Sequence, residues 1–231
     1  MIQILFSDRI RQVAPDLQVI AISARCSNPA TPDTLWDEIT EECNRIASKY
    51  KIEEIKLRPG IAATRAAYKA LGKEPNRYRP SSEAMCRRIV NGKGLYRMTA
   101  LIDIINLVSI RSGYSIGGFD ADRIVGDSLT LDAGNHDDVF CGIGRGPLNI
   151  EGLPVYRDEI GGIGTPTSDE ERTKLTPDTT NLLMLINIYG KEAEIDATLD
   201  LTISLLEKYA ALESVEAYLV NASDGQRSKL R

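Results

Sequence analysis

The stretch MTALIDIINLVSIRSG, residues 98–113, is apolar on almost every side when it is read as a helix. Helices of this kind are buried inside a protein instead of lying on its surface. Two polar residues interrupt the pattern, Asp103 and Asn106, and a spacing of three residues puts them on one helix face. Buried polar side chains need hydrogen-bond partners. Those partners are either the backbone of a neighbouring loop or a bound ligand. We expect Asp103 to anchor neighbouring backbone and Asn106 to face a pocket.

The segments on either side of this helix indicate an α+β protein. Several segments before and after it have helical spacing or helix-end signals, namely 33–50, 58–72, 81–94 and 197–212. From Gly113 onward, short apolar runs are separated by Gly, Asp, Asn and Pro, which is typical of antiparallel sheet with tight turns. Because no repeat or linker interrupts residues 1–231, we expect a single domain.

Individual strands can also be predicted from the sequence. The run NLLMLINIYG, residues 181–190, is apolar almost throughout and predicts a central strand. The run LQVIAISARC, residues 17–26, is rich in β-branched residues and predicts another. Residues 52–57 are expected to form a short strand or an extended link, and residues 221–231 a polar tail.

Charge is distributed unevenly along the chain, whose overall net charge is −5. Residues 56–97 contain eleven Lys or Arg and two Glu, a net of +9, whereas the remainder contains 17 against 31, a net of −14. A basic segment on an acidic protein favours a polyanionic partner that contacts one face. The alternative is that these side chains belong to solvated helix faces whose partners lie elsewhere in the fold.

The basic segment includes PNRYRPSSEAMCRR, residues 75–88, where four arginines surround a Pro-Ser-Ser-Glu turn. We expect a helix to begin at Ser81 or Ser82, with that serine as its cap. Free backbone N–H groups and the helix dipole favour anions at such a position. Flanking arginines would make it a phosphate or carboxylate site.

Other classes of site find little support in the sequence. The four cysteines are far apart and the single histidine is His136, so neither a metal site nor a bound cofactor is expected. The glycine-rich runs at 142–146 and 161–164 lack the context of a nucleotide site, and no nucleophile motif is present. No apolar run is long enough to span a membrane, and the unpaired cysteines favour a cytoplasmic protein.

Three runs taken in order resemble a known family: RYRPSSEAMCRR at 77–88, ALIDIINLVSIRSGYSIGGFDADRI at 100–124, and GGIG followed by TNLLMLI at 161–186. Together they are similar to the B3/B4 editing domain of the phenylalanyl-tRNA synthetase β-subunit, and to free-standing proteins made of that domain. The similarity covers about residues 50–190, which leaves an N-terminal strand and helix and a C-terminal helix as appendages. It implies packed, mostly antiparallel sheets in a sandwich-like arrangement, flanked by helices.

The resemblance also implies a substrate pocket. Asn106 matches the asparagine of the family's buried helix, and Gly161, Gly162 and Gly164 match its glycine turn. Gly117 stands where the synthetase motif has a histidine, and Leu185 stands where it has the glutamate that reads a tyrosine hydroxyl. Asn187 is the polar residue nearest to that position, so it is assigned to the pocket together with Gly117.

The resemblance implies hydrolysis of a mischarged tRNA in trans. The departures at Gly117 and Leu185 predict a preferred aminoacyl group other than tyrosine, whose identity the sequence does not specify. A separate editing pocket is useful where a synthetic site discriminates poorly between similar side chains. Contacts to the aminoacylated 3′ end of tRNA are expected from Arg77, Arg79, Ser81, Ser82, Arg87 and Arg88. Tyr68, Tyr78 and Tyr96 are available for base stacking. The alternatives are a non-catalytic RNA-binding protein and a protein that binds an amino-acid-like carboxylate in the same pocket.

Overall fold

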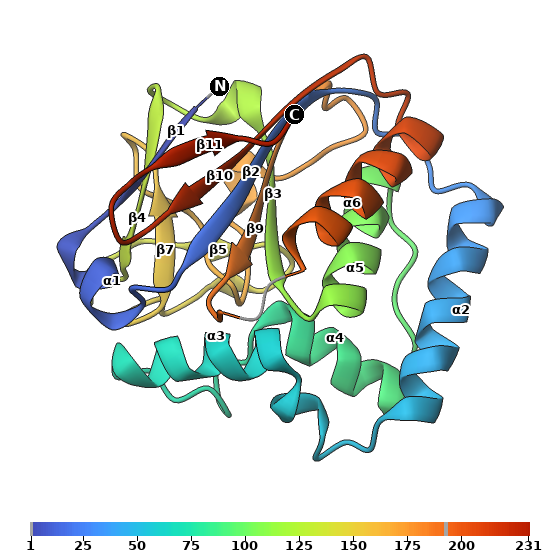
Figure 1. Ribbon diagram of the computed structural model, residues 1–231, viewed down its shortest axis with the longest axis horizontal. Coiled ribbons are helices and arrows are strands. Elements are labelled where there is room, and N and C mark those ends of the chain that lie inside the picture. The colour runs from blue at the N-terminus through green and yellow to red at the C-terminus, as the bar shows by residue number, and fades with distance from the viewer. Residues whose placement is uncertain (1, 192–193) are drawn as a thin grey trace.

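Two sheets facing one another form the framework of the molecule (Figure 1). The computed structural model describes residues 2–191 and 194–231. One sheet has the order β1-β4-β7-β8, and the other has the order β11-β10-β2-β9-β3. All neighbouring strands in these sheets are antiparallel except β1 and β4, which are parallel. The expected α+β fold with packed, mostly antiparallel sheets is confirmed.

The strands of the first sheet are β1 (Gln3–Phe6), β4 (Ser128–Ala133), β7 (Pro154–Arg157) and β8 (Gly162–Gly164). Those of the second are β2 (Gln18–Arg25), β3 (Ser115–Asp120), β9 (Asn181–Ile188), β10 (Ser214–Asn221) and β11 (Arg227–Lys229). A small pair, β5 (Cys141–Gly142) and β6 (Gly146–Pro147), lies outside both sheets.

Alternation along β9 shows how the second sheet is buried on both faces. Leu183 and Leu185 point into the core between the two sheets, whereas Met184 and Ile186 point toward the helices. Successive side chains of a strand face opposite sides, so an apolar run without polar interruptions fits a strand covered on both faces. The prediction that residues 181–190 form a central strand is confirmed, because β9 lies between β2 and β3.

Helices cover the outer face of the second sheet, as Figure 1 shows. They are α2 (Asp33–Lys49), α4 (Ser81–Val90), α5 (Ala100–Ser112) and α6 (Ile195–Tyr209). Helix α3 (Pro59–Ala70) places Tyr68 against Phe140 and Leu153 in a separate cluster, and α1 (Asp8–Val13) follows β1. Short 3₁₀ turns occur at η1 (Ile55–Leu57), η2 (Ala121–Arg123) and η3 (Glu171–Thr173).

Three local expectations are corrected by the structure. Residues 55–57 form the turn η1 instead of a strand or an extended link. The polar tail contains β11, which pairs with β10. The N-terminal segment is not an appendage, because β2 pairs with both β9 and β10 in the middle of its sheet. The turn η1 is held by local hydrogen bonds such as Leu57 N–H to the Glu54 carbonyl, whereas tertiary pairing determines the other two features, and local composition carries little information about such pairing.

Helix α5 is buried along most of its length, so both of its ends need partners inside the protein. At its start, the backbone N–H of Leu101 donates to the Asn28 side chain, and the Asp103 carboxylate accepts from the Met98 N–H. At its end, Gly113 has a φ of +84°, the left-handed conformation that commonly terminates a helix. The expected anchoring of neighbouring backbone by Asp103 is therefore present.

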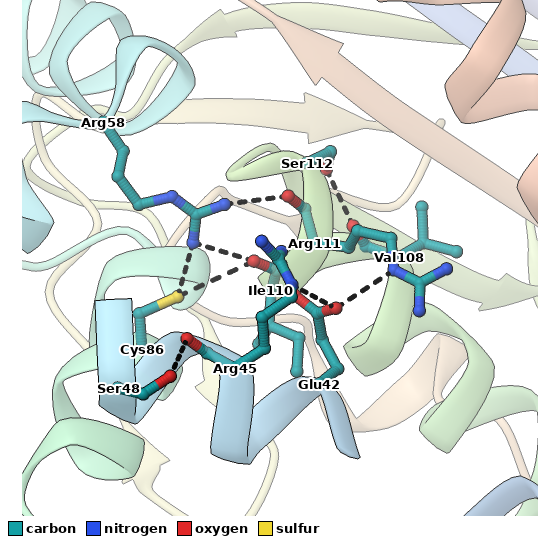
Figure 2. Close-up of polar contacts among 9 residues, drawn as sticks. All are labelled: Glu42, Arg45, Ser48, Arg58, Cys86, Val108, Ile110, Arg111 and Ser112. Atoms are coloured by element: carbon teal, nitrogen blue, oxygen red, sulfur yellow. Dashed lines mark hydrogen bonds and ion pairs between the residues drawn. The ribbon is translucent and has the colours of Figure 1, made fainter. Parts of the chain in front are cut away.

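The Arg58 side chain completes the C-terminal end of α5 (Figure 2). Its guanidinium donates to the carbonyl oxygens of Ile110 at 2.7 Å and Arg111 at 2.8 Å. It also lies 3.0 Å from the Cys86 sulfur on α4. Arg58 is only 7% exposed, so this cation is held inside the protein at the negative end of the α5 dipole. The contact joins α3, α4 and α5.

We predict that Arg58→Ala lowers the free energy of unfolding by about 2–4 kcal/mol. The substitution leaves two buried carbonyl groups without donors and removes a charge-assisted contact. Denaturant unfolding measures the change. The control is Arg77→Ala, which removes an exposed arginine and should change stability by less than about 0.5 kcal/mol. Equal stability losses in the two variants would contradict the role assigned to Arg58.

Candidate functional site

A cavity of about 460 Å³ lies between α4, α5, β3 and the segment 165–177. Most of its lining surface is apolar, and the apolar residues are Met85, Met98, Ile102, Ile105, Ile116, Ile143, Leu175 and Pro177. Its polar lining comprises Ser81, Thr99, Asn106, Ser109, Thr165, Ser168, Asp169 and Lys174. An apolar hollow of this size with a few converging polar groups is typical of a small-molecule site.

The two polar residues of α5 separate into different roles. Asp103 is buried below the cavity wall and accepts from the Thr31 hydroxyl and the Met98 N–H. Burial raises the pKa of Asp103, and hydrogen bonds from Thr31, Met98 and Asn106 oppose that rise. Asn106 itself lines the cavity. The Asp103 carboxylate is therefore engaged in hydrogen bonds within the protein, including one from loop backbone. Asn106, by contrast, borders the space that a ligand would fill.

The side chain of Asp169 lines the cavity, although this residue was not among the site residues predicted from the sequence. Its Oδ2 accepts from the backbone N–H of Gly118 at 3.3 Å. A Cβ atom on Gly164 would lie 2.7 Å from Oδ1 of Asp169, so the absence of a side chain there makes room for the carboxylate. Burial raises the pKa of Asp169 to about 7, with the Gly118 N–H opposing the rise. Strongly perturbed carboxylates in clefts are common at functional sites.

The glycines assigned to the pocket lie outside its lining in the described structure. Cβ atoms on Gly117 and Gly164 would lie 2.6 Å and 2.5 Å from the Phe119 ring, so both accommodate that ring in the core between the sheets. Gly162 packs against Val155 and Phe140 in the same way. Gly161 belongs to a turn whose N–H groups are held by Asp158. The residues that follow them, Thr165, Ser168 and Asp169, form the wall instead.

Asn187 is also directed away from the cavity. It is 3% exposed, accepts from the Tyr156 hydroxyl at 2.6 Å, and donates to the Ser115 carbonyl at 3.0 Å. Leu185 lies on the same face of β9, opposite Gly117, in the core between the sheets. The cavity is on the other face of β3, where Ile116 and Gly118 point. Asn187 therefore satisfies buried polar groups of the framework.

The basic segment is organised around a buried carboxylate. Glu83 is 1% exposed and accepts from Arg65 at 2.8 Å. Arg79 and Arg87 approach the same carboxylate at 3.9 Å and 4.0 Å. Arg87 also donates to the carbonyl of Ile52 at 3.0 Å. Part of the positive charge in residues 56–97 is thus balanced inside the fold, as the second interpretation of the charge pattern expected.

The start of α4 differs from the expected serine cap. Pro80 is the N-cap residue and no side chain caps the helix. Ser81 lines the cavity and its N–H donates to the Pro166 carbonyl at 2.7 Å. Ser82 is fully buried, with its hydroxyl 3.2 Å from that of Ser115. This burial removes Ser82 from the surface on which a tRNA contact was expected.

Other basic and aromatic residues of the segment 56–97 remain on the surface. Tyr96 is 67% exposed, and the Arg88 guanidinium carbon lies 4.1 Å from the centre of its ring. Arg77 is exposed and lies over the Tyr78 ring at 5.6 Å. Tyr68, by contrast, is fully buried and hydrogen-bonded to Thr167. Of the three tyrosines considered for stacking, Tyr96 offers the most exposed ring.

Comparison with known proteins identifies the family of this fold. The model of the B3/4 domain matches residues 63–206, which is more than half of the chain. The chain belongs to the B3/4 domain family. The match includes α4, α5, β3 and the segment 165–177, so the cavity lies within the B3/4 domain.

A solved structure is similar in fold to this B3/4 domain protein: an N-terminal fragment of the phenylalanyl-tRNA synthetase β-subunit from Pyrococcus horikoshii. The TM-score is 0.51 and the sequence identity is 14%. The comparison covers 99% of this chain and 54% of the synthetase fragment, so the chain spans about half the length of that fragment. No curated protein matches the chain.

Among residues 2–191 and 194–231, no three His, Cys, Asp or Glu side chains gather closely enough to hold a metal ion. No described helix combines the length and the hydropathy needed to pass through a lipid bilayer. Cys26, Cys43, Cys86 and Cys141 are free thiols.

We predict that Asp169→Asn stabilises the protein above pH 7 and has little effect near pH 4. The ordinary pKa of an aspartate is about 3.9 in an unfolded chain, and burial raises that of Asp169 to about 7. The folded state therefore binds more protons between these values, and wild-type stability falls as the pH rises through this window. Asparagine does not ionise, so the variant avoids this loss.

Melting temperatures of both proteins across pH 4–8 measure the effect. The matched control is Asp178→Asn, which removes an exposed carboxylate beside the cavity-lining Pro177. Its melting temperature should stay parallel to that of the wild type. A difference for Asp169→Asn that is constant with pH, or that shrinks as the pH rises, would contradict the assignment.

Proposed function

We propose that this B3/4 domain protein hydrolyses the ester bond of a mischarged aminoacyl-tRNA in trans. Membership of the B3/4 family supports the proposal, and the observation that carries it is the 460 Å³ cavity on α5. The cavity volume falls in the range of small-ligand sites, and Arg88, which lies over the exposed Tyr96 ring, is three residues after the cavity-lining Met85 on α4. A cytoplasmic location, where aminoacyl-tRNA is found, belongs to the same proposal.

The reaction requires little nucleophilic machinery from the protein. A water molecule adds to the ester carbonyl, the acyl–oxygen bond to the ribose breaks, the ribose oxygen takes a proton, and the amino acid leaves as a carboxylate. Orienting the ester and water supplies much of the rate, and hydrogen-bond donors stabilise the oxyanion. Thr99 lines the cavity and its buried hydroxyl has no hydrogen-bond partner among the described residues, so we assign it as a candidate donor.

A contact surface for the RNA follows from the periodicity of α4. Ser81 and Met85 line the cavity, and Arg88 continues the same helix face because residues four and seven positions apart are aligned. Arg88 supports one face of the Tyr96 ring, which leaves the other face for a nucleobase. Arg77 and Arg79, both exposed just before α4, are proposed to contact phosphates.

The direct test is deacylation of a panel of mischarged tRNAs by the purified protein, with ester loss compared with a no-protein control. We expect turnover of at least one substrate and slow turnover of tyrosine-charged phenylalanine tRNA, since Leu185 and Asn187 are enclosed in the framework. Salt-sensitive binding of RNA without turnover would replace hydrolysis with a binding function. Amino acid binding that is indifferent to RNA would assign the cavity to a small molecule.

We predict that Tyr96→Ala and Arg88→Ala weaken tRNA binding in distinguishable ways. Loss of a stacking surface costs about 1–3 kcal/mol and leaves the slope of log affinity against log salt unchanged. Loss of an arginine that contacts phosphate lowers the magnitude of that slope by about one unit. Binding titrations at several salt concentrations separate the two effects.

The matched control for the arginine is Arg227→Ala. Arg227 also lies over an aromatic ring, that of Tyr218, but it belongs to β11, away from α4. Its loss changes net charge equally and should leave affinity nearly constant. If all three variants bind tRNA as the wild type does, the proposed RNA surface is wrong.

A further inference from the structure

The cavity contains one carboxylate that lacks a cationic partner. Of the described lining residues, only Asp169 and Lys174 have acidic or basic side chains. Lys174 is paired with Glu171 at 2.5 Å. Asp169 accepts one long hydrogen bond, from the Gly118 N–H, and no cation is among the groups that affect its ionisation. The charge of Lys174 is thus compensated within the protein, whereas that of Asp169 is not.

The surroundings of Asp169 determine what kind of ligand complements it. Ile105, Ile116 and Leu175 contribute apolar surface to the same cavity, as do Met85 on α4 and Ile102 on α5. An isolated carboxylate in apolar surroundings is unfavourable until a cation approaches it. The best complement for this cavity is therefore a group with a single positive charge next to an apolar body.

We propose that Asp169 binds the α-ammonium group of an aminoacyl ester whose side chain is apolar. The inference rests on the proposed function for the identity of the ligand as an ester. An aminoacyl ester carries an ammonium group and no negative charge on its acyl part, which matches a cavity with one uncompensated carboxylate. Asp169 is thus a specificity-determining residue, and the aliphatic and methionine side chains receive the side chain of the amino acid.

The same charge arrangement distinguishes substrate from product. Hydrolysis converts the ester into a carboxylate a few bonds away from the ammonium group. The cavity offers that new negative charge no free cation among the described lining residues, since Lys174 is occupied by Glu171. Repulsion between the product carboxylate and Asp169 then favours release. A free amino acid is accordingly a weaker ligand than its ester.

Two model ligands test the inference without RNA and without turnover. Leucine methyl ester has the ammonium group, and methyl 4-methylpentanoate has the same carbon skeleton without it. Their dissociation constants for the full chain are measured by NMR titration at pH 7. We expect the wild type to bind leucine methyl ester about 10- to 100-fold more tightly, as for other charged hydrogen bonds. Asp169→Asn should bind both esters equally, and Asp178→Asn should retain the wild-type preference.

Several outcomes would overturn the inference. One is an undiminished preference for leucine methyl ester in Asp169→Asn, with folding verified by its melting temperature. Another is equal binding of the two esters by the wild type. A third is preferential binding of tyrosine methyl ester over phenylalanine methyl ester that disappears in Asp169→Asn, since Asp169 would then read a hydroxyl group.

The failure of this inference is distinguishable from failure of the proposed function. Retention of the full ammonium preference by Asp169→Asn, together with deacylation of a mischarged tRNA by the wild type, would remove only the role of Asp169. Loss of the preference in Asp169→Asn, with no tRNA substrate deacylated, would support the role of Asp169 and remove the hydrolase assignment.

Discussion

The carbonyl groups at the buried end of α5 need donors, and the guanidinium of Arg58 supplies them. The rest of the structure depends on this contact because α5 sits between the second sheet and the other helices. A helix in that position has no water at its end to satisfy its last carbonyls. Arg58, the residue directly before α3, replaces that water with a fixed cation and also reaches Cys86 on α4. The position of Asn106, Ile102 and the cavity follows from the position of α5.

The arginines of the basic segment have two different environments, which the sequence pattern alone does not distinguish. Arg65, Arg79 and Arg87 are gathered by the buried carboxylate of Glu83, and they hold α3, the loop before α4 and α4 together. Arg88 and Arg77 lie instead over tyrosine rings. A local excess of positive charge therefore indicates a polyanion surface only after its internal counter-ions have been identified, and here one glutamate accounts for several of the cations.

The sequence predicted the α+β fold and most helices, because the periodicity of apolar residues determines which segments are buried. It also predicted the family and the division between Asp103 and Asn106 on α5. The sequence analysis assigned the glycines and Asn187 to the cavity. That assignment depended on which face of each strand lines the cavity. A shift of one residue reverses that face. Only the pairing of β3 with β9 shows that Gly117, Leu185 and Asn187 face the other sheet.

Asp169 could not be found from sequence periodicity, because it belongs to a short irregular segment. The polar run Thr165 to Asp169 follows the glycine-rich strand β8, and that proximity was the available signal. Its carboxylate reaches the cavity because the chain turns back after β8, so that Asp169 bridges to Gly164. Such a turn depends on hydrogen bonds between Thr165 and Ser168, which composition alone does not specify.

The central place of β2 has a consequence for synthesis of the protein. This strand leaves the ribosome well before its two neighbours, β9 and β10, which lie far downstream of it in the chain. The middle of the second sheet therefore closes only after β9 and β10 have emerged. Until then both edges of β2 are unpaired and its apolar faces are exposed. The nascent chain is therefore prone to aggregate with other chains unless these surfaces are protected. Non-local pairing of this kind also slows folding.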